Sequence, residues 1–256
     1  MEEGLSIRSH YELKPVRGFH GPLLVESESL FRNRLSFPSE SEQLTWINRF
    51  IEGDVGQPLI LTLFDWEEDQ PQTDVYPTLL KQVAALDGYP LWKACPPLVR
   101  SQLRSWLQGS YHSKIWMAIP RLRRAEELTA LTNSLEQILN ELAGEHILFD
   151  RFPKIGVRLD SPLALRHFSQ FLSIDFFLLD LDRLVCHLLG IRYKKSVLLN
   201  YLPLRAEESE LLLYWIGSLP FAEKWIGCVS SVQKPWEKLL QFPYEAFFLR
   251  NPVPTE

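Results

Sequence analysis

Cysteine and histidine are too few and too scattered in this 256-residue chain to form a metal-binding motif. The three cysteines, Cys95, Cys186 and Cys228, lie far apart, no CxxC pair occurs, and the six histidines show no HExxH spacing. Zinc sites and disulfide frameworks depend on such spacings, so we expect neither. Isolated thiols are typical of a protein from a reducing cytoplasm.

Long apolar runs and an excess of positive charge are also missing. Residues 1–14 contain no apolar run of the kind found in signal peptides. No stretch reaches the roughly 20 apolar residues that a membrane helix needs. The net charge is -5, whereas nucleic-acid binding needs a basic face. We therefore expect a cytoplasmic protein that contacts neither membrane nor nucleic acid.

The chain does contain an alternation of short apolar runs with longer amphipathic segments. Several runs are continuously hydrophobic, which is typical of strands covered on both faces in a parallel sheet. The predicted strands are 5–11, 21–26, 59–65, 114–119, 155–160, 175–180, 196–202 and 225–229. Helical segments between most of them predict βα units. The predicted fold class is α/β, a (β/α)8 TIM barrel in one domain over residues 1–256, with a shortened first crossover at 12–20.

Two predicted helices begin with clear capping signals. Ser39 and Glu42 follow Pro38 in the S-x-x-E spacing of a capping box. Ser161 precedes Pro162 as a serine cap with proline at the first helical position. These signals place helix starts directly after predicted strands or loops, as βα units require.

Several segments, taken in order, resemble one known family. They are Gly21–Phe31 (GPLLVESESLF), Pro38–Gln43 (PSESEQ), Leu59–Asp65 (LILTLFD), Gln102–Leu107 (QLRSWL), Ile155–Pro162 (IGVRLDSP) and Asp175–Leu184 (DFFLLDLDRL). Together they resemble the C-terminal phosphoenolpyruvate-binding barrel of Enzyme I of the bacterial sugar phosphotransferase system. The resemblance implies a barrel of the phosphoenolpyruvate/pyruvate type, with its site at the carboxyl ends of the strands.

The sequence departs from that family at positions that carry its chemistry. Glu26 and Thr62 stand where the resemblance implies substrate-binding arginines, and Tyr201 where it implies a proton-donating cysteine. Arg183 stands in place of a metal-binding aspartate, whereas Asp160 keeps a carboxylate in place of a metal-binding glutamate. A carboxylate in place of an arginine repels phosphate. We therefore expect weak phosphoenolpyruvate binding of the family's kind.

The aspartates at the predicted strand ends leave two interpretations open. Asp160 with Asp182, or with Asp180, would suit a hard cation such as Mg²⁺. Alternatively, these aspartates cap the helices that follow them.

Two arginines, Arg121 and Arg158, are candidate ligands of an anion. Alternatively, Arg158 forms an internal ion pair beside Asp160, and the run 121–124 is a solvated face that pairs with Glu126 and Glu127.

Two functions follow from these departures. We favour a non-catalytic relative, a pseudoenzyme that acts in regulation or assembly through protein contacts. The loss of the family's arginines and the expected absence of a phosphohistidine domain before the barrel weigh in its favour. The resemblance implies that such a barrel forms a homodimer. A pseudoenzyme of this kind requires no cofactor.

The alternative function is that of a Mg²⁺-dependent enzyme of the phosphoenolpyruvate/pyruvate superfamily, a lyase, aldolase or phosphotransferase that acts on an oxoacid.

Overall fold

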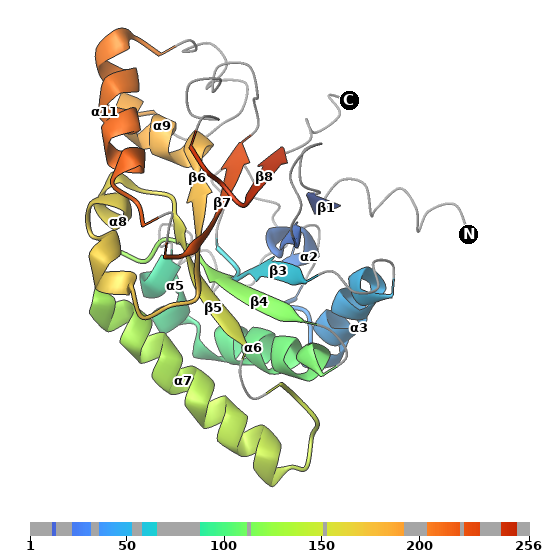
Figure 1. Ribbon diagram of the computed structural model, residues 1–256. Coiled ribbons are helices and arrows are strands. Elements are labelled where there is room, and N and C mark those ends of the chain that lie inside the picture. The colour runs from blue at the N-terminus through green and yellow to red at the C-terminus, as the bar shows by residue number, and fades with distance from the viewer. Residues whose placement is uncertain are drawn as a thin grey trace.

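The computed structural model describes most of the chain. The described residues are 12–13, 22–31, 36–52, 58–65, 88–111, 114–150, 153–191, 204–220, 223–230 and 242–249. They form one sheet whose strands alternate with helices (Figure 1). No helix within these ranges is both long and apolar enough to span a bilayer.

The sheet follows the chain order from β1 to β8. Its strands are β1 (Glu12–Leu13), β2 (Leu23–Glu26), β3 (Leu59–Thr62), β4 (Ile115–Ile119), β5 (Lys154–Leu159), β6 (Phe176–Asp180), β7 (Trp225–Ser230) and β8 (Ala246–Leu249). β1 is antiparallel to β2, and every later neighbouring pair is parallel. The parallel part of the sheet is curled into a half-barrel.

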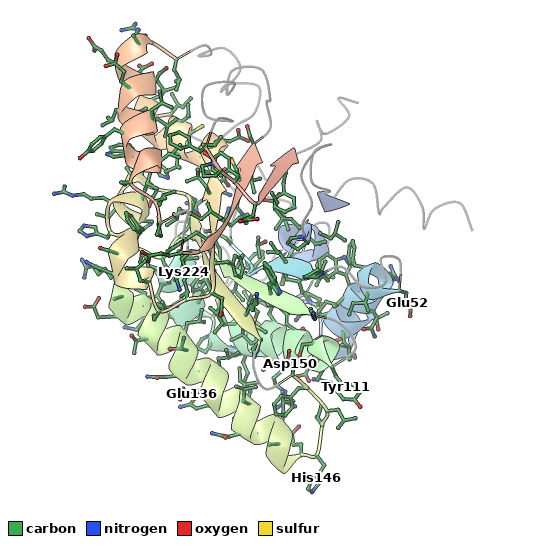
Figure 2. The ribbon with its side chains drawn as sticks, in the orientation of Figure 1. Glu52, Tyr111, Glu136, His146, Asp150 and Lys224 are labelled. Atoms are coloured by element: carbon green, nitrogen blue, oxygen red, sulfur yellow. The ribbon has the colours of Figure 1, made fainter. Side chains whose placement is uncertain are left out.

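The helices lie along the outer side of the curl. They are α2 (Glu28–Phe31), α3 (Glu40–Ile51), α5 (Gly88–Ala94), α6 (Pro96–Ser110), α7 (Ala125–Gly144), α8 (Pro162–Arg166), α9 (Leu181–Leu189) and α11 (Ala206–Gly217), with a 3-10 turn at Phe168–Phe171. The long α7 buries Leu131 and Ile138 on one face. On its other face Glu136 points away from the sheet (Figure 2).

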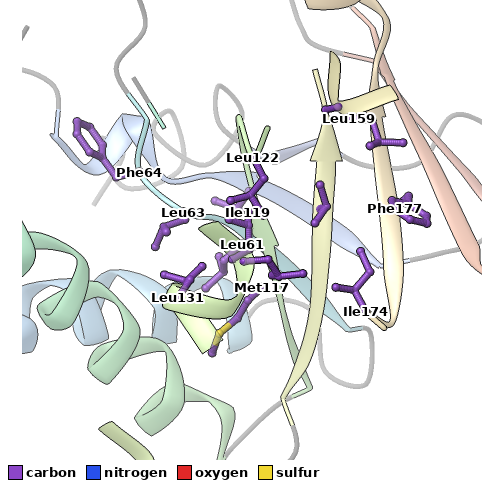
Figure 3. Packing of buried hydrophobic residues seen from close by; sticks show 14 of the residues in the cluster. Leu61, Leu63, Phe64, Met117, Ile119, Leu122, Leu131, Leu159, Ile174 and Phe177 are labelled. Atoms are coloured by element: carbon purple, nitrogen blue, oxygen red, sulfur yellow. The ribbon is translucent and has the colours of Figure 1, made fainter. Parts of the chain in front are cut away.

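Buried apolar side chains form two layers, one on each face of the sheet. The larger cluster lies between the sheet and the helices, and Figure 3 shows part of it, with Met117 of β4 and Leu131 of α7. The second cluster consists of strand residues alone: Leu24, Ile60, Trp116, Ala118, Phe176, Leu178, Val229, Ala246 and Phe248. Because side chains alternate along a strand, this cluster is the inner face of the curl. Burial of both faces explains the continuous apolar runs in the sequence.

Phe176 fills the inner face near the amino ends of the strands. Its ring centroid lies 5.3 Å from that of Trp116. A Cβ added to Gly156 would lie 2.4 Å from the Phe176 ring, so only glycine leaves room for it. The apolar packing at this end leaves the carboxyl ends of the strands as the place for polar groups.

The predicted barrel is seen in part. Six predicted strands correspond to β2–β7, and the strand expected at 5–11 lies outside the described residues. Within the described ranges, β8 pairs with β7 alone, so the described sheet is an open half-barrel.

One predicted strand was misplaced in the sheet order. The segment 196–202 was expected between the strands that became β6 and β7, and it lies outside the described residues. β6 and β7 pair directly through five Cα partners, which leaves no place for a strand between them. Tyr201 also lies outside the described residues, so the role that the resemblance implies for it stays a prediction. The strand β8 was not predicted.

Candidate functional site

Charged side chains gather at the carboxyl ends of the strands, away from Phe176. They are Glu26 of β2, Asp65 after β3, Arg121 after β4, Arg158 of β5, Asp160 after β5, Asp180 of β6, and Asp182 and Arg183 of α9. A buried charge is costly unless it is paired. In α/β folds of this kind, ligands bind at this edge of the sheet.

Arg158 is a fully buried cation that joins three strand ends. Its side chain is 1% exposed. Nε donates to Asp180 Oδ2 at 2.9 Å, and Nη2 contacts the same oxygen. Nη2 also lies 3.2 Å from Glu26 Oε1. Arg158 thus forms an internal ion pair, as one interpretation of the sequence held, and its direct partners are Asp180 and Glu26.

Asp180 ends β6 and also begins α9. Its Oδ1 accepts a hydrogen bond from the backbone N–H of Arg183 at 3.2 Å, which caps the helix. Its Oδ2 lies 3.6 Å from Arg183 Nε. The capping interpretation is therefore confirmed for Asp180. It is wrong for Asp160, because the side chain of Ser161 caps α8.

Arg121 is held just after β4 in a backbone conformation that is rare outside glycine. Its φ is 51°. Its N–H donates to Asp160 Oδ2 at 3.1 Å, and its Nε lies 2.5 Å from Asp65 Oδ2. Strain of this kind persists only where surrounding contacts enforce it, and it is common at functional sites.

The run 121–124 is divided between the site and α7. The side chain of Arg121 is only 13% exposed, so the solvated-face interpretation is wrong for this residue. Glu127 Oε2 accepts hydrogen bonds from the backbone N–H groups of Arg123 and Arg124, at 2.7 and 3.3 Å. Glu127 therefore caps the start of α7, in the manner of a capping box.

Gly88, at the start of α5, holds Asp65 from the other side. Its N–H donates to Asp65 Oδ1 at 2.9 Å. Its φ is 55°, and an added Cβ would lie 2.7 Å from Arg121 Cβ. Only glycine allows this approach. Gly88 was missed in the sequence, although the Asp87-Gly88 dipeptide is a turn signal.

Asp160 is buried, and one of its carboxylate oxygens is unsatisfied within the described part of the chain. The residue is 1% exposed, and its Oδ1 has no hydrogen-bond partner among the described residues. Burial raises the pKa of Asp160 above its usual value, against the opposing effect of Arg121, Arg158 and Arg183. Because an unsatisfied buried oxygen costs free energy, a ligand that brings a cation or a proton donor to Oδ1 would be stabilised here.

Asp182, the other predicted metal ligand, lies in the first turn of α9. Its Oδ1 accepts a hydrogen bond from Ser230 Oγ, at the end of β7, at 2.9 Å. Ser230 was missed because the strand was predicted to end one residue earlier. In the described part of the chain, no three His, Cys, Asp or Glu side chains form a group that could hold a metal ion. A cation here would depend on one or two carboxylates and on ligand oxygens, as Mg²⁺ commonly does.

Thr62 and Glu26, at the two positions where the resemblance implies arginines, make different kinds of contact. Thr62 Oγ1 accepts a hydrogen bond from the backbone N–H of Ser27 at 3.3 Å, which ties the end of β2 to β3. Glu26 is paired with Arg158 and keeps its side chain 20% exposed. Thr62 thus has a structural contact, whereas Glu26 adds a charge at the edge of the site.

Among the residues that the structure describes, the site carries more negative than positive charge. Its arginines are Arg121, Arg158 and Arg183, and its acids are Glu26, Asp65, Asp160, Asp180 and Asp182. Three positive and five negative charges leave -2 when all groups are ionised, and -1 when Asp160 is protonated. The charge balance of these residues therefore favours a divalent cation.

A cavity of about 450 Å³ lies elsewhere, between α5, α6 and α7. Its lining is mostly apolar, with Trp92 and Leu131 among its residues, and the charged side chains in the lining are Lys93 and Arg100. Arg100 also forms an ion pair with Glu141. Polar groups do not converge there as they do at a catalytic centre, so we place the functional site at the strand ends.

The fold and the strand-end charges define an α/β protein with a charged site at the carboxyl edge of a parallel sheet. The chain belongs to the family described as PEP-utilising enzyme, PEP-binding domain, which matches residues 8–210. It is 28% identical over 215 residues to Multiphosphoryl transfer protein 2 of Escherichia coli (strain K12), covering 82% of this chain and 26% of that protein. It is 26% identical over 219 residues to Phosphoenolpyruvate-protein phosphotransferase of Haemophilus influenzae, covering 82% and 37%. The chain thus spans about a quarter to just over a third of the length of these relatives.

The resemblance inferred from the sequence motifs is confirmed by this family match. Among solved structures, citrate synthase SbnG is similar at 9% identity with a TM-score of 0.44, over 88% of this chain and 75% of that chain. A likeness at that level carries no argument about function.

The expectation of a pseudoenzyme that acts through protein contacts was wrong. The family's PEP-binding domain is present over residues 8–210, and the relatives are named as phosphotransferases. The expectation rested on single replaced positions such as Glu26 and Thr62. The fold brings the strand-end arginines Arg121, Arg158 and Arg183 into electrostatic range of Asp160.

Proposed function

We propose that this chain binds phosphoenolpyruvate or the oxoacid derived from it, together with Mg²⁺, at the carboxyl ends of its strands. It would serve as the substrate-binding domain of a cytoplasmic enzyme of the phosphotransferase type. The observation that carries the proposal is the buried Asp160 carboxyl, which has three arginines in electrostatic range and one oxygen without a hydrogen-bond partner among the described residues. Membership of the family and the names of the relatives support the same class of substrate.

The arginines would bind the carboxylate of the ligand. Arg121 and Arg158 extend from neighbouring strand ends and are held in place by Asp65, Asp180 and Glu26. A guanidinium group has five N–H donors, so it can hold a protein carboxylate and a ligand carboxylate together. Donors fixed before the ligand arrives lose little entropy on binding.

The donor set fits Mg²⁺. Asp160 Oδ1 is a hard oxygen, buried and without a hydrogen-bond partner among the described residues, and Asp182 is a second carboxylate at the same edge of the sheet. Mg²⁺ commonly takes one or two protein carboxylates and completes its shell with water and ligand oxygens. When bound, the ion would polarise a carbonyl or phosphoryl oxygen of the ligand.

We also propose that the half-barrel closes into the eight-fold barrel of the phosphoenolpyruvate/pyruvate type. The inner apolar cluster includes Leu24 of β2 and Phe248 of β8, which come from opposite sides of the described sheet. Closure would enclose this buried cluster within one continuous sheet and remove the open strand edges of the described half-barrel. Slow amide hydrogen exchange along both edges of β8 would support it, and fast exchange along one edge would contradict it.

Thermal unfolding tests the proposed function. A ligand at 100 times its Kd adds about 2.7 kcal/mol, which is a rise in Tm of roughly 5–10 °C for a domain of this size. We expect such a rise with Mg²⁺ plus oxalate, pyruvate or phosphoenolpyruvate, and we expect Asp160→Asn to abolish it.

Asp175→Asn is the matched control. Asp175 precedes β6 at the opposite end of the sheet, where its Oδ2 accepts a hydrogen bond from the Ile155 N–H at 2.8 Å. This variant should keep the full rise in Tm. No rise with any of the three acids, or an equal rise in the wild type and Asp160→Asn, would contradict the proposal.

A further inference from the structure

We infer that Glu26 makes the strand-end site selective for unphosphorylated oxoacids, such as pyruvate and its enolate analogue oxalate, over phosphoenolpyruvate. The inference rests on the proposed function, because it concerns the ligand of the same site. Glu26 is a specificity-determining residue that acts through its charge.

Glu26 is the acid of the site that lies nearest to solvent. Its side chain is 20% exposed, whereas those of Asp65 and Asp180 are 1% and 0% exposed. It ends β2, and its Oε1 lies 3.2 Å from Nη2 of Arg158. A ligand that reaches Arg158 from the solvent therefore also approaches the Glu26 carboxylate.

The arginines of the site already face protein carboxylates. Arg158 contacts both Asp180 and Glu26, and Arg121 contacts Asp65. The paired N–H donors of a guanidinium group that bind a carboxylate are the same donors that bind a phosphate. A phosphoryl group would therefore have to compete with these carboxylates while being repelled by them.

The total charge of the site separates the two ligand classes. With one divalent cation bound, three arginines and five ionised acids sum to zero. Pyruvate adds one negative charge and oxalate two, whereas the carboxylate and phosphoryl group of phosphoenolpyruvate together add about 2.5 to 3. Like charges in a partly buried site repel strongly, so the extra charge costs phosphoenolpyruvate affinity. A cation bound at the Asp160 oxygen that has no hydrogen-bond partner among the described residues would contact either class of ligand, so it does not distinguish between them.

A purely structural role for Glu26 makes a different prediction. If Glu26 only neutralises Arg158, then Glu26→Gln lowers stability and changes the affinity of every ligand by a similar factor. If Glu26 sets selectivity, then Glu26→Gln changes the ratio of the affinities for pyruvate and phosphoenolpyruvate. This ratio does not depend on how much of the variant protein is folded.

Isothermal titration calorimetry in saturating Mg²⁺ measures this ratio, with pyruvate, oxalate and phosphoenolpyruvate as the probes. We expect the wild type to bind oxalate and pyruvate at least about tenfold more tightly than phosphoenolpyruvate, from repulsion at the partly buried Glu26. Glu26→Gln should reduce this preference by about tenfold, for the same reason. The matched control is Glu136→Gln, which removes the same charge from the exposed face of α7 and should keep the wild-type preference (Figure 2).

The outcomes separate the selectivity from the proposed function. Phosphoenolpyruvate binding as tight as pyruvate binding in the wild type would overturn the selectivity and leave the proposed function standing. An unchanged preference in Glu26→Gln would overturn the role of Glu26. Absence of binding by all three acids would overturn the proposed function and the selectivity with it.

Discussion

At the scale of single residues, the site depends on a few charged groups whose partners come from neighbouring strands. Arg158 lies between Asp180 and Glu26, and Arg121 lies between Asp65 and Asp160. Each arginine is thus positioned from two sides. Removal of one partner leaves a buried charge without its counter-charge, which costs much more than the pair itself contributes.

Arg158→Met should lower the free energy of unfolding by about 3–5 kcal/mol, because the Asp180 carboxylate then loses its closest cation. Adding Asp180→Asn to this variant should recover at least about 1 kcal/mol, since an uncharged asparagine can still cap α9. Urea denaturation of the two single variants and the double variant measures the coupling. Strictly additive losses would contradict the ion pair.

Gly88→Ala should cost about 1–3 kcal/mol, because a methyl group would press on Arg121 Cβ and the backbone has a positive φ. Gly144→Ala is the control, since an added Cβ at the last residue of α7 meets no atom within 4 Å. It should change stability by less than about 1 kcal/mol. Similar effects of the two substitutions in urea would show that the contact with Arg121 is unimportant.

The stability of the protein should depend on pH through Asp160. Burial raises the pKa of this carboxyl in the folded state, so the folded protein binds the proton more tightly than the unfolded chain. The stabilisation is full below the ordinary aspartate pKa of about 3.9, and it is lost as pH rises through the raised value.

Urea denaturation of the wild type and Asp160→Asn from acidic to neutral pH, in EDTA, checks this dependence. The free energy of unfolding of the wild type should fall relative to that of the variant as pH rises. Each tenfold difference in proton affinity contributes about 1.4 kcal/mol. A relative gain by the wild type would mean that the arginines outweigh burial.

At the scale of helices and strands, local signals in the sequence predicted much of the fold. The capping box of Ser39 and Glu42 is present, with Ser39 N–H donating to Glu42 Oε2 at 2.8 Å. The continuous apolar runs became β2–β7 because both faces of the sheet are buried. β8 was missed, because its four residues follow Pro243 and Glu245 and form no long run. The run 196–202 was assigned as a strand on hydrophobicity alone, which does not fix a place in the sheet.

Ser39→Ala should destabilise the protein by about 1 kcal/mol, because α3 loses the side chain that caps its first turn. Ser134→Ala is the matched control in the exposed interior of α7, where Ser134 Oγ donates to the Ala130 carbonyl at 3.0 Å. It should have little effect, since such a bond adds little to a helix. Thermal unfolding of both variants measures the difference, and equal Tm values would show that the cap is dispensable.

At the scale of the whole molecule, the charged members of the site could be predicted, but their pairing could not. Parallel strands bring their carboxyl ends to one edge, so charged residues at those ends had to lie close together. The partner of Arg158 depends on register. Arg158 is aligned with Leu178 of β6, which places Asp180 diagonally opposite on the same face. The short distance along the sequence suggested Asp160 as the ion-pair partner of Arg158, because the register between strands is not visible in one sequence.

The expectation of a pseudoenzyme was wrong because it gave more weight to the replaced positions Glu26 and Thr62 than to the strand-end arginines. The placement of those arginines in electrostatic range of Asp160 depends on the fold. The extent of the domain over residues 1–256 and the homodimer implied by the resemblance remain predictions. Sedimentation velocity would test the homodimer.

A crystal grown with Mn²⁺ and oxalate would locate the ligand directly. Anomalous scattering from Mn²⁺ should give one strong peak within coordination distance of Asp160, about 2.0–2.2 Å from a carboxylate oxygen. Oxalate density should lie between this peak and the side chains of Arg121 and Arg158. A peak at another place, such as the cavity between α5, α6 and α7, or no peak at all, would contradict a ligand site at the strand ends.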